Sequence, residues 1–484
     1  MSEPSDRTHV VVLGAGLAGL SVARAVLKSR PCGVTVLEKE GQPGGMAISL
    51  RVGGVTTDLG PHRIYSMIGE MRRWFREFLG ERMYLVRRVS RMYTHGRYLR
   101  YPPSPLELLR ALGPAALARF GGGYAMARLR ALVGGIDTNS FGGVMESAFG
   151  RSLCQTLVFP YIEKVWKTPP YGISADMARA RVTMGGMGAM VRRLFSRREE
   201  PGSESSLRTF HYVRGGIGTL ARGLANEIMS LGGEILCKAQ VRGLAVEKGR
   251  IASVWFRTEN GEDRCLPADF VFSTIPVRDL VESLRGDNDG WRPSDETVRA
   301  ARGLDSLNVV LVFVLARRRN LSADHWLYFP EAVPRFNRAY ESKNFDVTLA
   351  PIEQTLLCLE GTALPGSPEW RRPDSEIARE FLDDIIATGL LRREDVVETF
   401  VHRLENGYPL YRVDYLSRLK RILADLRAVG NLITLGRQGL FLHNNMDHSI
   451  YMGLRAAQCW IEKDNPVASW YDGADEFRNV RIVD

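Results

Sequence analysis

Three glycines and one glutamate near the start of the chain have the spacing of a dinucleotide site. Gly14, Gly16 and Gly19 form a G-x-G-x-x-G motif directly after the apolar run VVVL, and Glu38 ends a second short apolar run. The first glycine permits a tight turn, the second lets the backbone approach a pyrophosphate, and the third lets helix and strand pack closely. The helix that follows offers N–H groups to phosphates, and the carboxylate accepts hydrogen bonds from a ribose diol. The order of these features predicts a strand–helix–strand unit that binds a dinucleotide.

The residues after Glu38 favour FAD over NAD. An NAD-binding unit normally continues into another helix and strand, whereas here the pair Gly44–Gly45 and a hairpin-like stretch come next. This pattern resembles the FAD-binding flavoproteins of the glutathione-reductase-like class, in which a glycine pair follows the ribose-binding acid and meets the cofactor. The stretch DLGPH, which contains Gly60 and His62, resembles the segment beside the isoalloxazine ring. The alternative interpretation is an ordinary glycine-rich turn.

Two later segments resemble the amine-oxidase superfamily of flavoproteins. Residues 212–276 have a GGxGxL helix start, a strand, a hairpin and a buried strand, like the returning half of the flavin domain in that superfamily. Residues 432–458 resemble its last strand and helix, and the N-terminus of such a helix suits the negative charge of a reduced flavin pyrimidine. The resemblance implies non-covalent FAD, with NADPH as a candidate reductant. Besides Gly14, Gly16, Gly19 and Glu38, the cofactor contacts that it implies are Leu17, Ala18, Lys39, Gly45, Met46, Gly60, His62, Val241, Gly436, Arg437, Asn445, Met446 and Asp447.

The remaining motifs resemble the UDP-galactopyranose mutase branch of this superfamily, with a more distant likeness to protoporphyrinogen oxidase. The stretches DLGPHRIYS, HGRYLRYPPSP, FPYIEKVWKTPP and GRQGLFLHNNMDHS carry the resemblance, and the weaker matches LYFPEAVPRFNRAYESKNF and ENGYPLYR place Arg338 and Tyr408 near the site. In the mutases two arginines hold the diphosphate of a UDP-sugar. The resemblance assigns that role to Arg338 and Arg437, because an arginine fork suits phosphate oxygens. It also places His62 against the flavin. The alternatives are structural ion pairs for the arginines and a hydrogen-bonded core histidine for His62.

Two departures from the mutase pattern leave the substrate open. His443 replaces a mutase tyrosine, and the glutamine that follows the Tyr-Pro pair in some mutases is absent from YPPSP. One candidate is an FAD-dependent enzyme, redox-neutral or oxidising, that acts on a nucleotide-linked or lipid-linked sugar in polysaccharide or natural-product biosynthesis. A second is an oxidase or desaturase of a hydrophobic substrate, and a third is a flavin-binding protein with a structural or regulatory role. The catalytic residues that the first candidate implies are His62, Arg338, Tyr408, Arg437 and His443.

The motifs divide the 484 residues into five segments. We expect an α/β fold with a glutathione-reductase-like Rossmann FAD-binding domain and an inserted α+β substrate domain. The FAD-binding domain takes residues 8–66, 207–280 and 430–470, and the substrate domain takes a helical region, 67–206, and a strand-containing region, 281–429. Residues 190–208 read as a loop, either a mobile lid or a plain linker.

The charge and composition of the chain limit the kinds of ligand and partner that we expect. The net charge of +10 suits an anionic small-molecule substrate, and we find no nucleic-acid-binding signature. The six cysteines lie far apart in the sequence, so we expect reduced thiols in a cytoplasmic protein and no metal site. The polar N-terminus is not a signal peptide, and no apolar run approaches ~18 residues. Residues 105–135 are basic and amphipathic, so they either rest on a membrane surface or pack on their own domain. The sequence predicts no particular oligomeric state.

Overall fold

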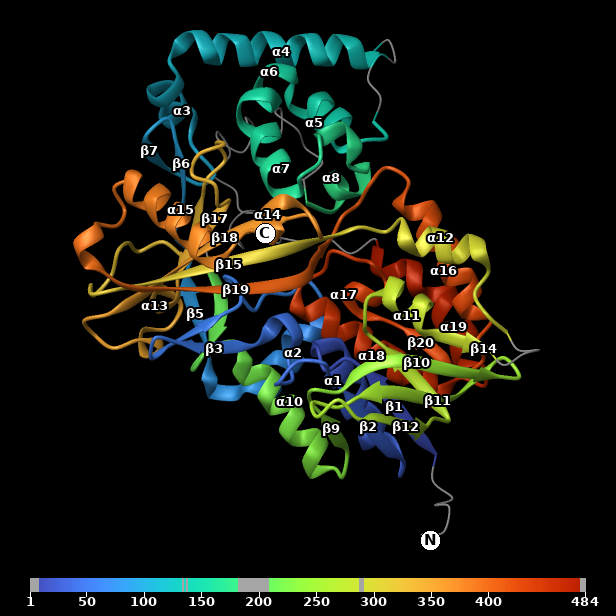
Figure 1. The fold of residues 1–484 in the computed structure, drawn as a ribbon. Coiled ribbons are helices and arrows are strands. Elements are labelled where there is room, and N and C mark those ends of the chain that lie inside the picture. Colours follow the sequence, from blue (N-terminus) through green and yellow to red (C-terminus); the bar gives the residue numbers. More distant parts are fainter. Residues whose placement is uncertain (1–7, 133–134, 136–137, 182–208, 287–290, 479–484) are drawn as a thin grey trace.

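The computed structural model describes residues 8–132, 135, 138–181, 209–286 and 291–478. The expected loop at 190–208 lies outside these residues. A five-stranded parallel sheet, a seven-stranded sheet and a group of helices make up most of the described chain (Figure 1). These three parts all contribute to the wall of one large cavity.

The cofactor motif lies in the parallel sheet, whose strand order is β20-β13-β1-β2-β9. The strands are β1 (His9–Leu13), β2 (Gly33–Leu37), β9 (Glu234–Leu236), β13 (Phe270–Ser273) and β20 (Leu432–Thr434). Helices α1 (Leu17–Ser29), α10 (Gly218–Ser230) and α18 (Met446–Glu462) share a hydrophobic core with this sheet. Because both faces of the sheet are covered, its strands are continuous apolar runs, and Val10–Leu13 are fully buried. The sheet therefore joins the two ends of the chain in one domain and confirms the expected α/β fold class.

An antiparallel hairpin covers part of the domain, as the sequence predicts. Strands β10 (Gln240–Glu247), β11 (Arg250–Arg257) and β12 (Asp263–Pro267) form consecutive antiparallel pairs. Their inward residues join a second core with α11 (Val277–Ser283) and α16 (Tyr415–Arg427). This placement holds β10, which carries Val241, against the cavity.

The substrate region is built on a seven-stranded sheet with the order β19-β15-β18-β17-β16-β6-β7. The strands are β6 (Ser90–Thr94), β7 (Arg97–Arg100), β15 (Ser306–Ala316), β16 (Trp326–Tyr328), β17 (Arg338–Glu341), β18 (Thr355–Ala363) and β19 (Val396–Pro409). β6 pairs with β16 in parallel, and the other pairs are antiparallel. Residues 67–206 thus contribute two strands to this sheet, in addition to helices.

The helices between residues 105 and 181 gather at one end of the molecule (Figure 1). They include α3 (Pro105–Leu112), α4 (Pro114–Leu132), α5 (Phe141–Phe149), α6 (Arg151–Leu153), α7 (Phe159–Trp166) and α8 (Ala175–Arg181). α3 begins with a capping box in which Ser104 and Glu107 satisfy each other's backbone N–H groups. α7 points its inner face at the cavity, which Ile162, Val165 and Trp166 line.

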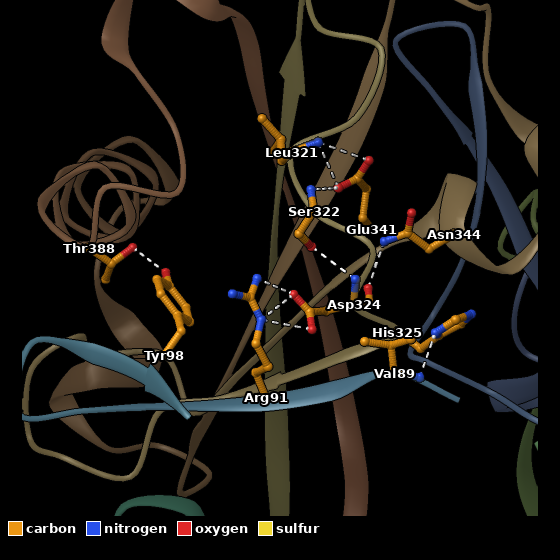
Figure 2. A network of polar contacts seen from close by, with 10 residues as sticks. All are labelled: Val89, Arg91, Tyr98, Leu321, Ser322, Asp324, His325, Glu341, Asn344 and Thr388. Carbon is orange, nitrogen blue, oxygen red and sulfur yellow. Dashed lines mark hydrogen bonds and ion pairs between the residues drawn. The ribbon is translucent and has the colours of Figure 1, made fainter. Parts of the chain in front are cut away.

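A polar network ties β6 to the rest of the seven-stranded sheet (Figure 2). Arg91 donates to both carboxylate oxygens of the buried Asp324, with the closest contact at 2.5 Å. The backbone N–H of Val89 donates to Nδ1 of His325, and the N–H of His325 donates to the carbonyl of Val89. Buried Glu341 accepts hydrogen bonds from the loop before β16. The network fixes the register of β16 and β17, the strands that carry cavity residues.

Candidate functional site

The candidate site is a cavity of about 2610 Å³ between the parallel sheet, the seven-stranded sheet and the helices. Most of the site residues expected from the sequence line it, although they come from distant parts of the chain. The expected residues that line the cavity are Gly14, Gly16, Leu17, Ala18, Glu38, Lys39, Gly45, Met46, Gly60, His62, Val241, Arg338, Tyr408, Gly436, Arg437, His443, Asn445 and Met446. Gly19 and Asp447 do not line it.

The glycine motif leaves its backbone open to the cavity. A Cβ added to Gly16, the N-cap of α1, would meet no atom within 4 Å. Gly14 has φ +94°, and a Cβ there would come within 2.4 Å of Oγ1 of Thr274. A Cβ on Gly19 would lie 2.0 Å from the carbonyl oxygen of Gly14, so this glycine permits close packing of α1 rather than ligand contact. These three geometries match the separate roles expected from the spacing.

Glu38 and the glycine pair frame the same loop. The buried Glu38 carboxylate accepts the backbone N–H of Ala15 at 2.7 Å and that of Glu40 at 2.9 Å. The N–H of Gly44 donates to the carbonyl of Ala15 at 2.8 Å, so the glycine pair is held against the first turn. The result is a rigid cradle of backbone with one carboxylate at its edge.

His62 lies where the cofactor domain meets the seven-stranded sheet. Its Nδ1 is buried and has no hydrogen-bond partner. Burial, followed by the nearby charges of Arg437 and Arg338, lowers the pKa of His62 to about 3. The imidazole is therefore neutral at physiological pH and cannot act as a cationic acid there. The two arginines influence one histidine, which places all three groups at the same part of the cavity.

Arg338 is held in a buried ion pair. Its Nε and Nη2 donate to Oε2 of Glu360 at 3.1 and 2.5 Å, and Nη2 also contacts Oη of Tyr408 at 3.3 Å. Glu360 is 3% exposed and lies in β18, beside β17. The carboxylate of Glu360 raises the pKa of Arg338 against the opposing effect of burial. The structural ion pair that was the alternative for Arg338 is therefore present, and the Glu360 carboxylate offsets the positive charge of Arg338 within the wall.

Arg437 is held mainly by neutral oxygens. Its Nη2 donates to the backbone oxygen of Asn444 at 2.5 Å, and its Nε donates to the side-chain oxygen of the same residue at 3.2 Å. Nη1 lies 3.4 Å from both the carbonyl of Gly407 and the sulfur of Met46. These oxygens and the sulfur hold the guanidinium in one orientation in the cavity wall. The residue links the cofactor loop, β19 and the start of α18.

His443 packs against the helical region. Its Nε2 lies 2.6 Å from the carbonyl oxygen of Pro409, so this nitrogen carries the proton. The imidazole contacts the indole of Trp166 edge to face, with ring centroids 4.9 Å apart. Tyr408 lies parallel to the same imidazole at 6.3 Å. His443 thus orients two aromatic side chains of the cavity wall.

Asp447 does not line the cavity, although its neighbours Asn445 and Met446 do. Asn445 caps α18 in a capping box with His448. Asp447 is buried, and its Oδ2 lies 3.6 Å from Nε2 of His448. The N-terminus of α18 therefore meets the cavity through Asn445 and Met446, and the cofactor contact expected of Asp447 stays a prediction.

Lys164 in the KVW stretch clamps the loop after β16. Its Nζ donates to the carbonyls of Phe329 and Glu331, each at 2.7 Å, and to that of Pro334. The clamp joins α7, which carries Tyr161 and Trp166, to the loop that precedes Arg338. This lysine therefore positions cavity residues without reaching the cavity wall itself.

Several cavity residues were not expected from the sequence. Glu360 is the most important residue that the sequence reasoning missed. It is the one charged residue in the stretch TLLCLEGTA, and this position could have indicated a buried carboxylate. Arg63 and Arg88 also line the cavity, with Cζ at 5.9 and 5.0 Å from the ring of Trp326. Arg63 directly follows His62 in the stretch DLGPHRIYS, whereas Arg88 lies outside every stretch that carried the resemblance.

In the parts of the chain that the structure describes, no group of three or more His, Cys, Asp or Glu residues could hold a metal ion. Across those same parts, no helix is both long and apolar enough to cross a membrane.

The fold and the cavity define an α/β enzyme class in which a dinucleotide loop opens directly onto a substrate chamber. The chain belongs to the flavin-containing amine oxidoreductase family, whose family model matches residues 17–459. It is similar to the crystal structure of reduced UDP-galactopyranose mutase, with a TM-score of 0.80 and 22% identity over 99% of this chain and 98% of that one. It is also similar to a protein from Exiguobacterium sp. 255-15 assigned as a protoporphyrinogen oxidase, with a TM-score of 0.66 and 17% identity over 95% and 99% of the two chains.

A local similarity extends to a phytoene dehydrogenase from Streptomyces griseus. The two sequences are 36% identical over 140 residues, which is 29% of this chain. The chain matches only 21% of that relative's length. This similarity concerns a segment, and the structural similarities above concern the fold.

The residues present fit a flavin dinucleotide. The open backbone at Gly16, the carboxylate of Glu38 and the N-terminus of α1 match the needs of a ribose and a pyrophosphate. At the other end, the buried Nδ1 of His62 lacks a protein partner beside the cavity. When bound, FAD supplies the reactive ring that exchanges electrons or forms bonds with substrate, so the protein needs no nucleophile of its own. The cavity residues would hold this ring, and Arg338 and Arg437 would place charge near it.

Proposed function

We propose that the protein is a flavoenzyme of the UDP-galactopyranose-mutase type. In this proposal FAD binds non-covalently, and the substrate is an anionic nucleotide-linked or lipid-linked sugar that is isomerised without net redox change. The observation that carries the proposal is the position of Arg338, in β17, and Arg437, in α17 (Gly436–Gly439), which both line the cavity and both lie against Tyr408. The full-length fold similarity to the mutase supports it.

Each of these residues has a distinct task in the proposal. Arg437 supplies a positive charge in the cavity wall for a phosphate group. Arg338 supplies a weaker charge, since Glu360 shares its guanidinium. Tyr408 contacts both members of that pair and orients them. Neutral His62 packs beside the cofactor without adding a competing cation.

Two additional arginines in the cavity wall support the proposal that the substrate is anionic. Arg63 and Arg88 lie on the part of the wall near Trp326, which is separate from the cofactor loop. Positive charge in a cavity with apolar walls concentrates anionic ligands. The aromatic side chains of Tyr161, Trp166 and Tyr328 provide surfaces for a sugar or a base.

A second candidate function is an oxidase or desaturase of a hydrophobic substrate. The aromatic lining and the offset charge of Arg338 favour it, because both reduce the need for a charged ligand. In this case NADPH is not required as a reductant, whereas a mutase-type enzyme needs its flavin reduced before turnover. The two candidates therefore differ in their dependence on redox state.

Calorimetric titration with UDP tests the proposal at the arginines. We expect UDP to bind the native enzyme, with an affinity that falls roughly tenfold to a hundredfold in Arg437→Ala, since charged hydrogen bonds contribute about 1.5–3 kcal/mol. Arg338→Ala should have a smaller effect. Arg264→Ala, on the exposed strand β12, is the matched control and should bind like the native enzyme. If UDP does not bind, or if all three variants bind equally, the nucleotide-sugar proposal is wrong.

A further inference from the structure

Helix α4 is apolar on its outer side as well as its inner side. It lies across one end of the molecule with α5 and α6 on its inner side (Figure 1). Phe120 and Ala127 are buried on that inner side. Met126, Leu129 and Leu132 are 51%, 58% and 83% exposed. Large apolar side chains that gather on one exposed face commonly mark an interaction surface.

Arginines border this exposed strip. At about 100° per residue, Leu129 and Leu132 lie opposite the buried side of the helix. By the same rotation, Arg128 lies on one edge of the strip, and Arg119 and Arg130 lie on the other edge. All three arginines are exposed. An apolar strip with arginine along both edges is typical of a helix that lies in the plane of a membrane surface.

Helix α3 continues the same chemistry. Leu106 and Leu109 are exposed, and Arg110 is exposed beside them. Glu107 is the one acidic residue between positions 105 and 132 of the sequence. Its carboxylate accepts hydrogen bonds from the N–H and hydroxyl of Ser104 at 2.9 and 2.8 Å, so it serves the helix cap. The surface of α3 and α4 therefore carries arginine with almost no offsetting negative charge.

We infer that the exposed face of α3 and α4 is a docking surface for a lipid bilayer that contains anionic phospholipids. The leucine and methionine side chains would enter the boundary between headgroups and acyl chains. The arginines would extend to the phosphates at the same depth, because a long basic side chain can cover apolar surface while its charge stays in a polar layer. An anionic bilayer therefore accommodates both the apolar side chains and the arginines of this face.

Charge argues against a second copy of this chain as the occupant. Two copies packed through α4 would bring the arginines of one helix against those of the other. The sequence of α4 holds no aspartate or glutamate to pair with them, and like charges in contact are unfavourable. An anionic membrane removes this repulsion and replaces it with attraction.

The docking surface adjoins the cavity. Tyr101 and Pro102 line the cavity, and α3 begins at Pro105. Tyr101 is 45% exposed, so it lies at the rim rather than inside. A membrane-bound enzyme would thus have part of its cavity rim close to the bilayer. Delivery of a lipid-linked substrate by this route rests on the proposed function, whereas the membrane contact itself does not.

Vesicle co-sedimentation of the flavin-loaded enzyme tests the inference. The probes are vesicles of phosphatidylglycerol with phosphatidylcholine and vesicles of phosphatidylcholine alone. We expect binding to the anionic vesicles that weakens with salt. Arg128→Gln and Arg130→Gln should each weaken it about fivefold, which is the effect of one basic residue near an anionic surface. The double variant Leu129→Gln/Leu132→Gln should weaken it further.

Matched controls and an independent measurement keep the test decisive. Leu231→Gln and Arg264→Gln change exposed residues far from α4 in the sequence and should bind vesicles like the native enzyme. Circular dichroism of each variant confirms that the fold is kept. Absence of binding to anionic vesicles, or equal binding to neutral ones, overturns the inference. Light scattering that shows a dimer which dissociates in the Leu129→Gln/Leu132→Gln variant also overturns it, because a second copy then covers the face. UDP titration is unaffected by any of these outcomes, so failure here leaves the proposed function standing.

Discussion

Removal of one member of the Arg338–Glu360 pair should destabilise the protein strongly. In Glu360→Gln the guanidinium keeps its charge but loses the carboxylate at 2.5 Å, and Glu360 is nearly fully buried. Loss of one partner from a buried pair costs about 3–5 kcal/mol. The lower value applies here, because the Arg338 side chain is 22% exposed and glutamine can still accept a hydrogen bond.

The expected change in melting temperature follows from the size of the chain. At about 2.1 cal/mol/K of unfolding entropy per residue, 484 residues give about 1 kcal/mol/K. A loss of about 3 kcal/mol then lowers Tm by about 3 °C. Scanning calorimetry and urea unfolding of the flavin-loaded enzyme measure this change. Asp263→Asn, which breaks the exposed pair with Arg257, is the control and should leave Tm nearly unchanged.

A double-mutant cycle separates the pair from its surroundings. Arg338→Gln/Glu360→Gln removes both charges, so the double variant should be more stable than the sum of the single effects predicts, by about 2 kcal/mol. Equal destabilisation by Glu360→Gln and by the exposed control would refute the reasoning, because it would mean that the pair is hydrated rather than buried. Strict additivity in the cycle would lead to the same conclusion.

Further predictions concern the cofactor loop, the buried histidine and the polar network. Gly14→Ala should lower both flavin content and Tm, because its φ is +94° and the new Cβ meets Oγ1 of Thr274; absorbance of the purified protein and calorimetry check this. Because the pKa of His62 is lowered to about 3, the unfolded chain gains a proton below about pH 6.5 that folded His62 does not. The free energy of unfolding should therefore decrease as the pH is lowered from about 6.5 towards 3, by at most about 1.4 kcal/mol per pH unit. His62→Asn should show a smaller decrease over the same pH range in unfolding titrations. Asp324→Asn should weaken the contact with Arg91 and cost about 1–3 kcal/mol, and faster amide exchange in β6 and β16 should accompany the loss.

The cofactor part of the fold could be predicted because its information is local. The glycine motif, the acid at Glu38 and the hairpin of residues 240–267 each occupy a short stretch with a definite period and turn chemistry. The structure adds the physical reason for each glycine, and it shows that Gly19 serves packing.

The substrate part could be predicted only in part, because it depends on contacts between distant segments. Arg338 was expected at the site, but its partner Glu360 was not. Neither segment alone predicts that β17 pairs with β18. Asp447 was expected at the cofactor, whereas Asn445 and Met446 line the cavity at the start of α18 and Asp447 does not, so its cofactor contact stays a prediction. Arg63, Arg88 and Trp326 meet only after the seven-stranded sheet has formed. Composition and motif matching cannot supply such contacts.

The redox dependence of sugar isomerisation tests the central claim most directly. The purified enzyme is kept under anaerobic conditions with UDP-galactopyranose, either oxidised or reduced with dithionite, and the sugar products are separated by chromatography. The proposed function predicts isomerised UDP-sugar from the reduced enzyme alone, with loss of turnover in Arg437→Ala. Absence of product from the reduced enzyme with UDP-galactopyranose and with other UDP-sugars, together with oxygen uptake on a hydrophobic substrate, would contradict it and assign the cavity to oxidation.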